Sequence, residues 1–300
     1  MAAYPDAPLR ALIFDVDGTL AETERDGHRV AFNRAFAELG LGWDWDEALY
    51  GRLLAVTGGK ERMLHYWRGI DPQAAAAPDA VALVAELHRR KTRHYVELVA
   101  QGALALRPGV RRLLEQARDD GLILAIATTT TPDNVDALLR STLGEAGCAM
   151  FACVGAGDIV PRKKPDPGIY QWVLQRLGLQ PGQCLAFEDS PAGLRSASAA
   201  GLRSVVTPGT YTCDEDFDGA WALLDGLGED AQPARGHVAG ADWSGVVDPQ
   251  CLRQWAQFGQ EYLSREQMTV RVWGRVALSS PKGSASLDRS LGGAQPPDAA

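Results

Sequence analysis

The chain has few cysteines, no long apolar run and no excess of positive charge. Its 5 cysteines are odd in number and form no CxxC pair, which disfavours a disulfide framework and a zinc finger. No apolar stretch approaches the roughly 20 residues of a membrane helix, and the start, MAAYPDAPLR, lacks the apolar segment of a signal peptide. With 38 acidic against 30 basic residues, the net charge of −8 disfavours nonspecific binding to nucleic acid. These absences predict a cytoplasmic protein with reduced thiols and with neither nucleic-acid nor membrane partners.

The chain does have enough apolar residues for a large core. Of its 300 residues, 46% are hydrophobic, which predicts one or two folded domains. Four short apolar runs are typical of buried parallel strands: 9–14, 122–127, 183–187 and 203–206. Helical patterns at 110–120 and 191–200 precede the second and fourth of these strands, and each stops at a glycine. Strands alternating with helices predict an α/β fold with a parallel sheet.

A long helical stretch separates the first two predicted strands. Its predicted helices cover 26–39, 45–56, 60–68 and 80–100. An all-helical insertion at this place predicts a second, smaller domain that lies over the sheet. The predicted units are a core (9–23 and 103–225), a helical cap (24–102) and a C-terminal extension (226–300). Within the extension, we expect a weak helix at 249–267 and, because the composition is of low complexity, disorder from about residue 270.

The segment ALIFDVDGTLAETE (11–24) carries the sharpest chemical signal. Asp15 and Asp17 directly follow a buried strand, and open α/β sheets bind ligands at the carboxyl ends of their strands. Two neighbouring carboxylates repel each other and lose hydration, so they bring the strand end no structural gain. Gly18 allows the backbone to turn, and Thr19 supplies a hydroxyl and an amide near an anion. A loop with capping aspartates is the alternative, but the pattern favours a catalytic site.

Further polar residues follow in an order that resembles one family. LAIATTTT contains Thr128, PRKKPDP contains Lys164, and LAFEDS contains Glu188 and Asp189. Together with DVDGT, these segments resemble the four motifs of the haloacid dehalogenase superfamily, most of whose members are phosphatases. The resemblance covers about residues 9–212. It implies an α/β fold, with a Rossmann-like parallel-sheet core and an all-helical cap domain inserted after the first strand.

The resemblance also implies a mechanism through an aspartyl-phosphate. Asp15 would attack phosphorus, and Asp17 would protonate the leaving oxygen and then activate water. Mg²⁺ is the implied cofactor, with the ligands Asp15, Asp17 (through its backbone carbonyl), Glu188 and Asp189. The residues implied to hold the transferring phosphoryl oxygens are Thr128, Thr129 and Lys164. Lys163, which does not directly precede the proline, is interpreted as a solvated surface charge.

Several cap segments resemble the CbbY-type branch, whose characterised members are phosphatases acting on xylulose 1,5-bisphosphate. The most informative segment is TGGKER (57–62). Gly58 and Gly59 allow close backbone approach, and the first turn of the following helix presents free amides to an anion. Lys60 and Arg62 add positive charge, and we expect them to hold a phosphate distal to the scissile one.

The remaining substrate contacts are implied by the same resemblance. The full set of implied substrate-binding residues is Glu24, His28, Gly58, Gly59, Lys60, Glu61, Arg62, His88, Arg89, Lys91 and Asn134. Compared with the CbbY-type branch, this chain carries one extra residue between Glu24 and His28. The implied partner is a small phosphorylated sugar, and such an enzyme would remove inhibitors of Rubisco. The oligomeric state is left open.

Other functions stay open at this point. A β-phosphoglucomutase-like mutase uses the same motifs but must keep water from the intermediate, and a phosphoglycolate phosphatase-like enzyme shares the chemistry. A dehalogenase needs neither metal nor a second acid, so Asp17 and the pair Glu188 and Asp189 argue against it. A binding module without activity is disfavoured because every chemical position is filled. The sequence therefore favours a Mg²⁺-dependent phosphatase acting on a sugar bisphosphate.

Overall fold

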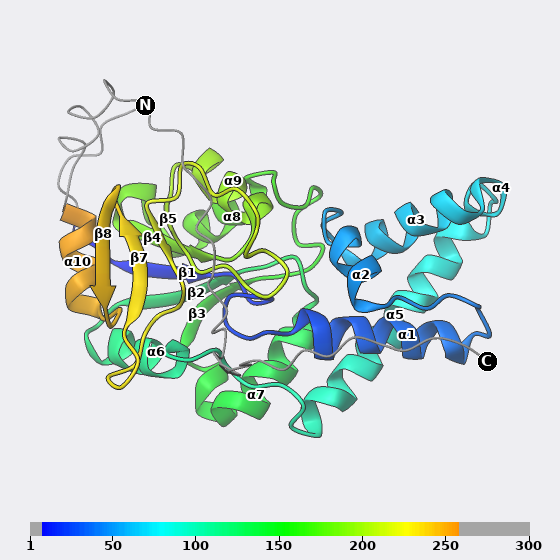
Figure 1. Cartoon of the computed structure of the whole chain (residues 1–300), viewed down its shortest axis with the longest axis horizontal. Coiled ribbons are helices and arrows are strands. Elements are labelled where there is room, and N and C mark those ends of the chain that lie inside the picture. Colours follow the sequence, from blue (N-terminus) through cyan, green and yellow to red (C-terminus); the bar gives the residue numbers. More distant parts are fainter. Residues whose placement is uncertain (1–7, 258–300) are drawn as a thin grey trace, which may run out of the picture.

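A mixed sheet forms the centre of the protein. The computed structural model describes residues 8–257 (Figure 1). In these residues, eight strands lie in the order β3-β2-β1-β4-β5-β6-β7-β8. Their bounds are Ala11–Phe14 (β1), Ile123–Ala127 (β2), Phe151–Gly155 (β3), Cys184–Glu188 (β4), Arg203–Val206 (β5), Ala222–Leu224 (β6), Ala234–Val238 (β7) and Ala241–Gly245 (β8). The strands from β1 to β6 pair in parallel, whereas β7 and β8 are antiparallel additions at one edge.

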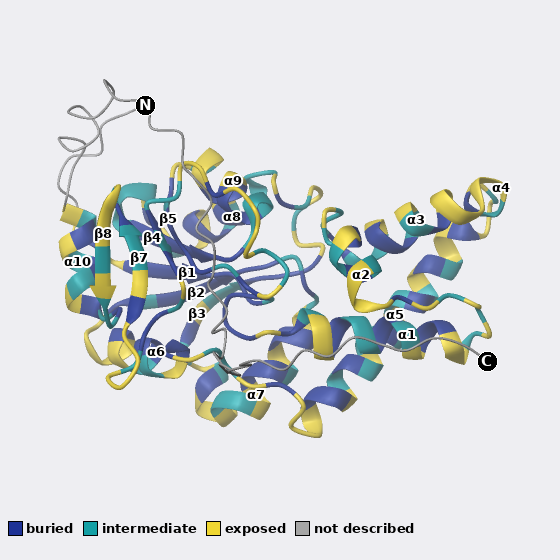
Figure 2. Ribbon diagram, in the orientation of Figure 1, coloured by how far each residue is buried: buried dark blue, intermediate teal, exposed yellow. Residues whose placement is uncertain are grey.

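Helices cover both faces of the sheet, and the strands are buried between them (Figure 2). Side chains alternate along each strand, so Leu12 and Phe14 face one layer while Ala11 and Ile13 face the other. The first layer contains α6 (Val110–Asp119), α7 (Pro132–Cys148) and α10 (Pro249–Gln257). The second contains α8 (Gly168–Leu177) and α9 (Pro191–Ala199). This three-layer arrangement confirms the predicted α/β fold with a largely parallel sheet.

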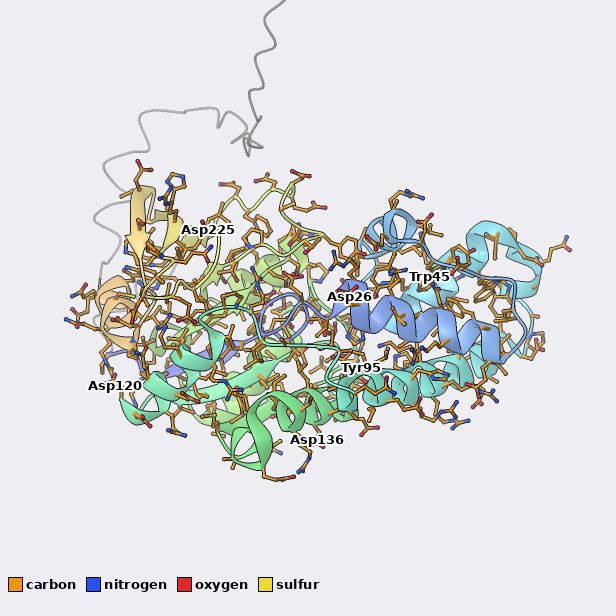
Figure 3. The ribbon with its side chains drawn as sticks, turned by 60° about the horizontal axis from the view of Figure 1, so that its bottom comes forward. Asp26, Trp45, Tyr95, Asp120, Asp136 and Asp225 are labelled. Atoms are coloured by element: carbon orange, nitrogen blue, oxygen red, sulfur yellow. The ribbon has the colours of Figure 1, made fainter. Side chains whose placement is uncertain are left out.

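The helical insertion forms its own layer of helices to one side of the sheet (Figure 1). After a π-helical turn at Glu24–His28, its helices are α1 (Arg29–Glu38), α2 (Glu47–Leu53), α3 (Gly59–Ile70), α4 (Pro72–Ala75) and α5 (Ala80–Ala100). Fully buried aromatic side chains such as Phe36 and Trp45 give it a hydrophobic core of its own. Trp45 lies deep in this insertion, and Tyr95 lies nearer the sheet (Figure 3). The insertion is called the cap below.

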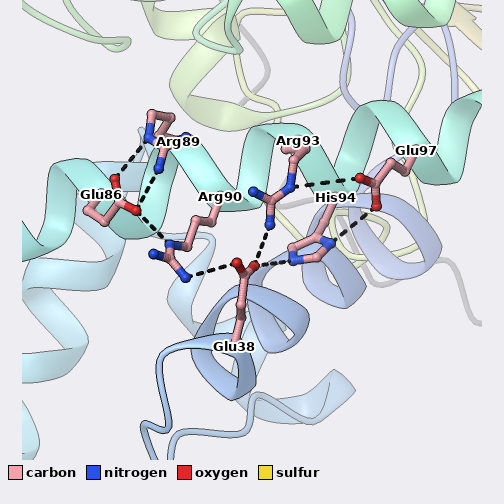
Figure 4. Close-up of polar contacts among 7 residues, drawn as sticks. All are labelled: Glu38, Glu86, Arg89, Arg90, Arg93, His94 and Glu97. Atoms are coloured by element: carbon pink, nitrogen blue, oxygen red, sulfur yellow. Dashed lines mark hydrogen bonds and ion pairs between the residues drawn. The ribbon is translucent and has the colours of Figure 1, made fainter.

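An ion-pair network joins α1 to α5 on the surface of the cap (Figure 4). The carboxylate of Glu38 on α1 accepts from Arg90, Arg93 and His94 on α5, at 2.8, 2.5 and 2.8 Å. Hydrogen bonds from Arg93 and His94 hold the pKa of Glu38 below its ordinary value. Exposed ion pairs contribute little individually, so the network mainly sets how the two helices meet.

The end of the chain differs from the prediction. The boundary predicted at residue 226 separates β6 from β7, yet these strands are hydrogen-bonded neighbours in the sheet, so residues 226–257 continue the core. β7 and β8 were missed because they are short and half-exposed, which leaves no apolar run. The helix predicted at 249–267 is present over Pro249–Gln257; its remainder, and the disorder predicted from 270, lie outside the described residues. In the part of the chain that is described, no helix has the length and apolarity to cross a membrane.

Candidate active site

The turn after β1 places Asp15 and Asp17 at the carboxyl edge of the sheet. The amide of Asp15 donates to the carbonyl of Phe187 at 2.9 Å, which continues the β1–β4 ladder into the turn. Buried Val16 separates the two aspartates. Gly18 follows with φ = +84°, and a Cβ added there would lie 2.1 Å from a carboxylate oxygen of Asp189. Only glycine therefore lets the turn approach the acidic pair Glu188 and Asp189 at the end of β4.

A buried lysine bridges two of the acids. Lys164 Nζ lies 2.8 Å from Asp15 Oδ1 and 2.6 Å from Glu188 Oε1. Burial alone disfavours the ammonium, but the carboxylates of Asp15 and Glu188 raise the pKa of Lys164 above its ordinary value. Tyr170 on α8 donates a hydrogen bond to the same oxygen of Glu188, and its ring lies 5.1 Å from the ammonium. Lys164 is therefore held as a cation directly beside Asp15.

The acids at this edge suit a divalent cation. One oxygen from each of Asp15, Glu188 and Asp189 lies within 4.8 Å of the others, and all three residues are buried. Glu188 Oε2 is buried and has no hydrogen-bond partner. Burial raises the pKa of Asp15 to about 7 and that of Asp189 well above its ordinary value, because one lysine cannot offset three carboxylates. A hard cation with oxygen ligands would both offset this charge and use the unpaired oxygen of Glu188.

Asp17 takes its partners from the chain entering the cap and from α5. Its Oδ1 accepts from Thr23 at 2.5 Å and lies 2.8 Å from Nε2 of His28. Nδ1 of His28 lies 2.8 Å from Nζ of Lys91 on α5. Because an ammonium can only donate, the contact with Lys91 makes Nδ1 of His28 the acceptor and leaves Nε2 to donate to Asp17. Burial opposes ionisation of Asp17, but His28 and Thr23 outweigh it and lower the pKa to about 2.

A π-helical turn brings His28 to Asp17. The amide of His28 donates to the carbonyl of Thr23 at 2.8 Å, five residues back along the chain. Such a turn uses one residue more than an α-helical turn, and π-turns are frequent at functional sites. The turn therefore accommodates the extra residue noted between Glu24 and His28. The ring of His28 also stacks on Tyr95, with 4.2 Å between the centroids.

Two adjoining pockets lie between the cap and the core. The first is lined by Asp17, Glu24, His28, Phe32, Gly58, Gly59, Arg62, His88, Lys91, Thr129, Thr130, Thr131 and Asn134. The second contains Asp15, Lys164 and Asp189, and it shares Asp17, Glu24, Arg62 and Thr129 with the first. The carbonyl of Gly155 accepts from the amide of Thr128, which is buried at the end of β2. The structure therefore joins a carboxylate-rich core side to a cap side lined by Arg62, His88 and Lys91.

A chain of hydrogen bonds holds two cap residues at the first pocket. Arg62 is buried and donates to the carbonyl of Leu53 at 3.2 Å and to the hydroxyl of Tyr50 at 3.1 Å. Tyr50 in turn donates to Glu24. Burial lowers the pKa of His88 to about 3, with Lys91 adding to the effect, so this imidazole is neutral in the pocket wall. The lining thus offers one guanidinium, one buried ammonium and a neutral imidazole.

Three residues predicted to bind substrate do not line either pocket. Arg89 is exposed and pairs with Glu86 at 2.6 Å, because it lies on the opposite side of α5 from His88 and Lys91, which are three residues apart. Lys60 pairs with Asp158 of the core at 2.5 Å. The carboxylate of Glu61 lies so close to Gly58 that a Cβ added there would be 2.2 Å from it. The structure therefore does not bring these three side chains to either of the two pockets.

The interpretation of Lys163 as a solvated charge is wrong. Its side chain is only 13% exposed and lies 2.6 Å from Asp158, the same carboxylate that binds Lys60. It also donates to the carbonyl of Gly157 at 2.5 Å. The sequence pattern did not reveal this arrangement because Asp158 carries no motif of its own. The contact of Tyr170 with Glu188 was missed as well, because Tyr170 belongs to no motif.

Comparison with known proteins agrees with this geometry. Residues 9–201 match the model of the haloacid dehalogenase-like hydrolases. The chain belongs to this family. It is 51% identical over 249 residues to the protein CbbY (plasmid) of Cupriavidus necator, which covers 82% of this chain and 96% of that protein.

Solved structures place this haloacid dehalogenase-like hydrolase in the CbbY branch. Crystal structures of CbbY from Rhodobacter sphaeroides, one with phosphate and one of a mutant with xylulose-(1,5)bisphosphate, are 47% and 46% identical, each with a TM-score of 0.68. Each match covers 74% of this chain and 98% of the other. The predicted membership and phosphatase class are thus confirmed.

Proposed function

We propose that this haloacid dehalogenase-like phosphatase uses Mg²⁺ to hydrolyse a sugar bisphosphate similar to xylulose 1,5-bisphosphate. The observation that carries the proposal is the pair of adjoining pockets, with buried acids on the core side and Arg62, His88 and Lys91 on the cap side. A substrate with a phosphate at each end places one at Asp15 and the other against the positive charge of the cap. The CbbY structure with xylulose-(1,5)bisphosphate supports this choice of sugar.

Each residue of the site has a separate role in the proposed reaction. Asp15 attacks phosphorus and the bond to the sugar oxygen breaks, which leaves an aspartyl-phosphate. Asp17 supplies a proton to the leaving oxygen and later removes one from the attacking water. The ammonium of Lys164 and the hydroxyl of Thr128 hold oxygens of the transferring group. Mg²⁺, held by Asp15, the carbonyl of Asp17, Glu188 and Asp189, would supply positive charge that offsets phosphate repulsion.

The contact between His28 and Asp17 controls the protonation of Asp17. With the cap in the position that the structure shows, the carboxylate of Asp17 is ionised and can therefore act as the base for water. A phosphate dianion placed beside it raises its pKa, because a neighbouring negative charge disfavours the ionised form. Binding of substrate thus favours the protonated form that the first step needs. Lys91 and His28 take part in this control as groups that the cap brings to Asp17.

A substrate panel tests the proposal. Purified full-length protein is assayed with xylulose 1,5-bisphosphate, ribulose 1,5-bisphosphate, phosphoglycolate, hexose phosphates and an aryl phosphate, with Mg²⁺ or EDTA. We expect phosphate release that is fastest from a pentulose bisphosphate, lost in EDTA and restored by Mg²⁺. A clear preference for phosphoglycolate would overturn the bisphosphate assignment. An isomeric sugar phosphate in place of free phosphate, seen by ³¹P NMR, would identify a mutase.

A further inference from the structure

Arg107 lies where the chain returns from the cap to the core. Its amide donates to the carbonyl of Leu20 at 2.9 Å, and a short antiparallel bridge joins Ala21 to Leu106 beside it. The outgoing and returning segments between core and cap are therefore paired. The side chain of Arg107 is only 11% exposed, so its charge needs partners within the protein.

The guanidinium of Arg107 ties together two loops at the catalytic edge. It donates to the carbonyl of Gly18, in the turn that carries both catalytic aspartates. It also donates to the carbonyls of Thr207 and Pro208, at 2.7 and 2.9 Å, in the loop after β5. The amide of Thr207 in turn donates to the carbonyl of Glu188 at 2.9 Å. One side chain thus connects the turn after β1 to the backbone that carries the acidic pair.

The Gly18 turn is held from two sides. Its Cα faces Asp189, since an added Cβ would lie 2.1 Å from that carboxylate, while its carbonyl is bound by Arg107. Arg107 does not line the pocket that contains Asp15 and Lys164. It therefore has no direct access to substrate. Its effect on the reaction passes through the position of this turn and through its charge, which favours the ionised form of Asp189 and lies 3.6 Å from Glu22.

We propose that Arg107 is a positioning residue, which fixes the Asp17–Gly18 turn against Glu188 and Asp189 so that the acids and the Asp17 carbonyl form one cation site. The planar, forked guanidinium suits this task, because it reaches carbonyls of two separate loops at once. A lysine presents a single ammonium and cannot span them equally well. The inference rests on the proposed Mg²⁺-dependent reaction.

Arg112 provides a matched control. It lies on α6, its side chain is 18% exposed, and it donates to the carbonyls of Val247, Leu227 and Gly228 at 2.9, 3.2 and 2.7 Å. It thus makes the same kind of contact as Arg107, to segments next to β7 and β8 instead of to the catalytic turn. Substitution of either arginine removes comparable main-chain hydrogen bonds, but only Arg107 touches the turn with the aspartates.

The test compares Arg107→Gln and Arg107→Lys with Arg112→Gln and Arg112→Lys in the full-length protein. Calorimetric titration measures the Kd for Mg²⁺, and phosphate release measures kcat on an aryl phosphate and on xylulose 1,5-bisphosphate. We expect Arg107→Gln to raise the Kd for Mg²⁺ at least tenfold and to lower kcat at least tenfold on both substrates. Arg107→Lys should lie between Arg107→Gln and the wild type. Both Arg112 variants should lower the Tm but stay within twofold of the wild type in Kd and kcat.

The outcomes separate this inference from the proposed function. An active wild type whose Arg107 variants match the Arg112 variants in Kd and kcat overturns the inference alone. A wild type that neither binds Mg²⁺ nor releases phosphate from any substrate overturns both. If Arg107→Gln does not fold, the two lysine variants decide: equal Kd and kcat for Arg107→Lys and Arg112→Lys overturn the inference, and a selective loss in Arg107→Lys supports it.

Discussion

The core side and the cap side of the active site differ in where their charges find partners. On the core side, Lys164 is held between Asp15 and Glu188, and all three residues lie at one edge of one sheet. On the cap side, Asp17 is a core residue whose partners His28 and Lys91 come from the cap. The surroundings of the nucleophile therefore come from the core alone. Asp17, the acid and base, depends on partners that the cap supplies.

The same difference sets the protonation of the two aspartates. Burial among other acids raises the pKa of Asp15 to about 7, whereas donation from His28 and Thr23 lowers that of Asp17 to about 2. Asp15 thus needs the positive charge of a cation to lose its proton and act as a nucleophile. Asp17 needs the negative charge of the substrate to gain a proton and act as an acid. Two identical side chains, two residues apart, take different roles because their surroundings differ.

The largest effect is expected on the core side. Asp15→Asn should lower kcat by about 10³-fold or more, because an amide is neither a nucleophile nor an equivalent cation ligand. The measurement is phosphate release from an aryl phosphate and from a sugar bisphosphate. Asp26→Asn is the matched control, since Asp26 is half-exposed in the cap and, among residues 8–257, pairs with Arg25. Retention of even a tenth of wild-type activity by Asp15→Asn would exclude the aspartyl-phosphate mechanism.

The next effect is expected at the contact between cap and core. Lys91→Met should lower kcat by about 10- to 100-fold, because loss of one charge-assisted hydrogen bond costs about 1.5–3 kcal/mol. In this variant, no ammonium donates to Nδ1 of His28. The proton of His28 is then no longer held at Nε2, the nitrogen that faces Asp17. Arg90→Met is the control on the same helix, since Arg90 pairs with Glu38 and Glu86 away from the pocket. Equal losses in the two variants would mean that Lys91 only stabilises the cap.

The Lys91→Met substitution should raise the stability of the protein although it lowers kcat. Burial lowers its pKa to about 8, so between about pH 8 and its ordinary 10.5 the unfolded chain binds more protons than the folded one. Wild-type stability therefore rises with pH through this window. At pH 7 the buried charge costs up to about 3 kcal/mol, and Lys91→Met should recover part of it. Urea unfolding at several pH values checks this, and an advantage of the variant that does not shrink above pH 8 contradicts it.

A smaller effect is expected at Lys60. The structure pairs it with Asp158 rather than with the pocket, so Lys60→Ala should lower kcat/KM about equally for a bisphosphate and an aryl phosphate. An exposed ion pair is worth about 0.2–1 kcal/mol, which corresponds to a factor of about 1.4–5. Asp158→Asn should have at least as large an effect, because it also removes the partner of Lys163, and the double variant should be no worse than Asp158→Asn. A selective loss of 10-fold or more on the bisphosphate would restore the distal-phosphate role predicted from the sequence.

The smallest effect is expected at the end of the chain. Removal of residues beyond about 270 should leave the Tm and kcat unchanged, because this segment is polar and far in sequence from every motif. Truncation after residue 225 is the contrasting variant and should prevent folding. It removes buried residues that pack in the same core as β1 and α6, namely Leu227, Val238, Val247, Leu252 and Trp255. A fall in kcat on the shorter truncation would assign the tail a part in the site.

The sequence by itself was sufficient for the core side of the site. Asp15 and Glu188 each directly follow a predicted strand, and the carboxyl ends of parallel strands meet at one edge of a sheet. The order of the motifs along the chain therefore predicted which side chains would meet. The cap helix with His88 and Lys91 was predicted as well, but the sequence grouped Arg89 with them, and the structure leaves Arg89 exposed and outside this pocket.

Only the tertiary structure decided which long-range contacts these residues make. Lys60 meets Asp158, Lys163 shares that carboxylate, and Arg107 binds carbonyls about 90–100 residues away in either direction. Local pattern carries no information about such pairs, since they depend on how the cap is seated and on where loops cross. The sequence likewise did not predict β7 and β8, because this half-exposed hairpin has no apolar run of its own. Its strands form through pairing with each other and with the neighbouring β6.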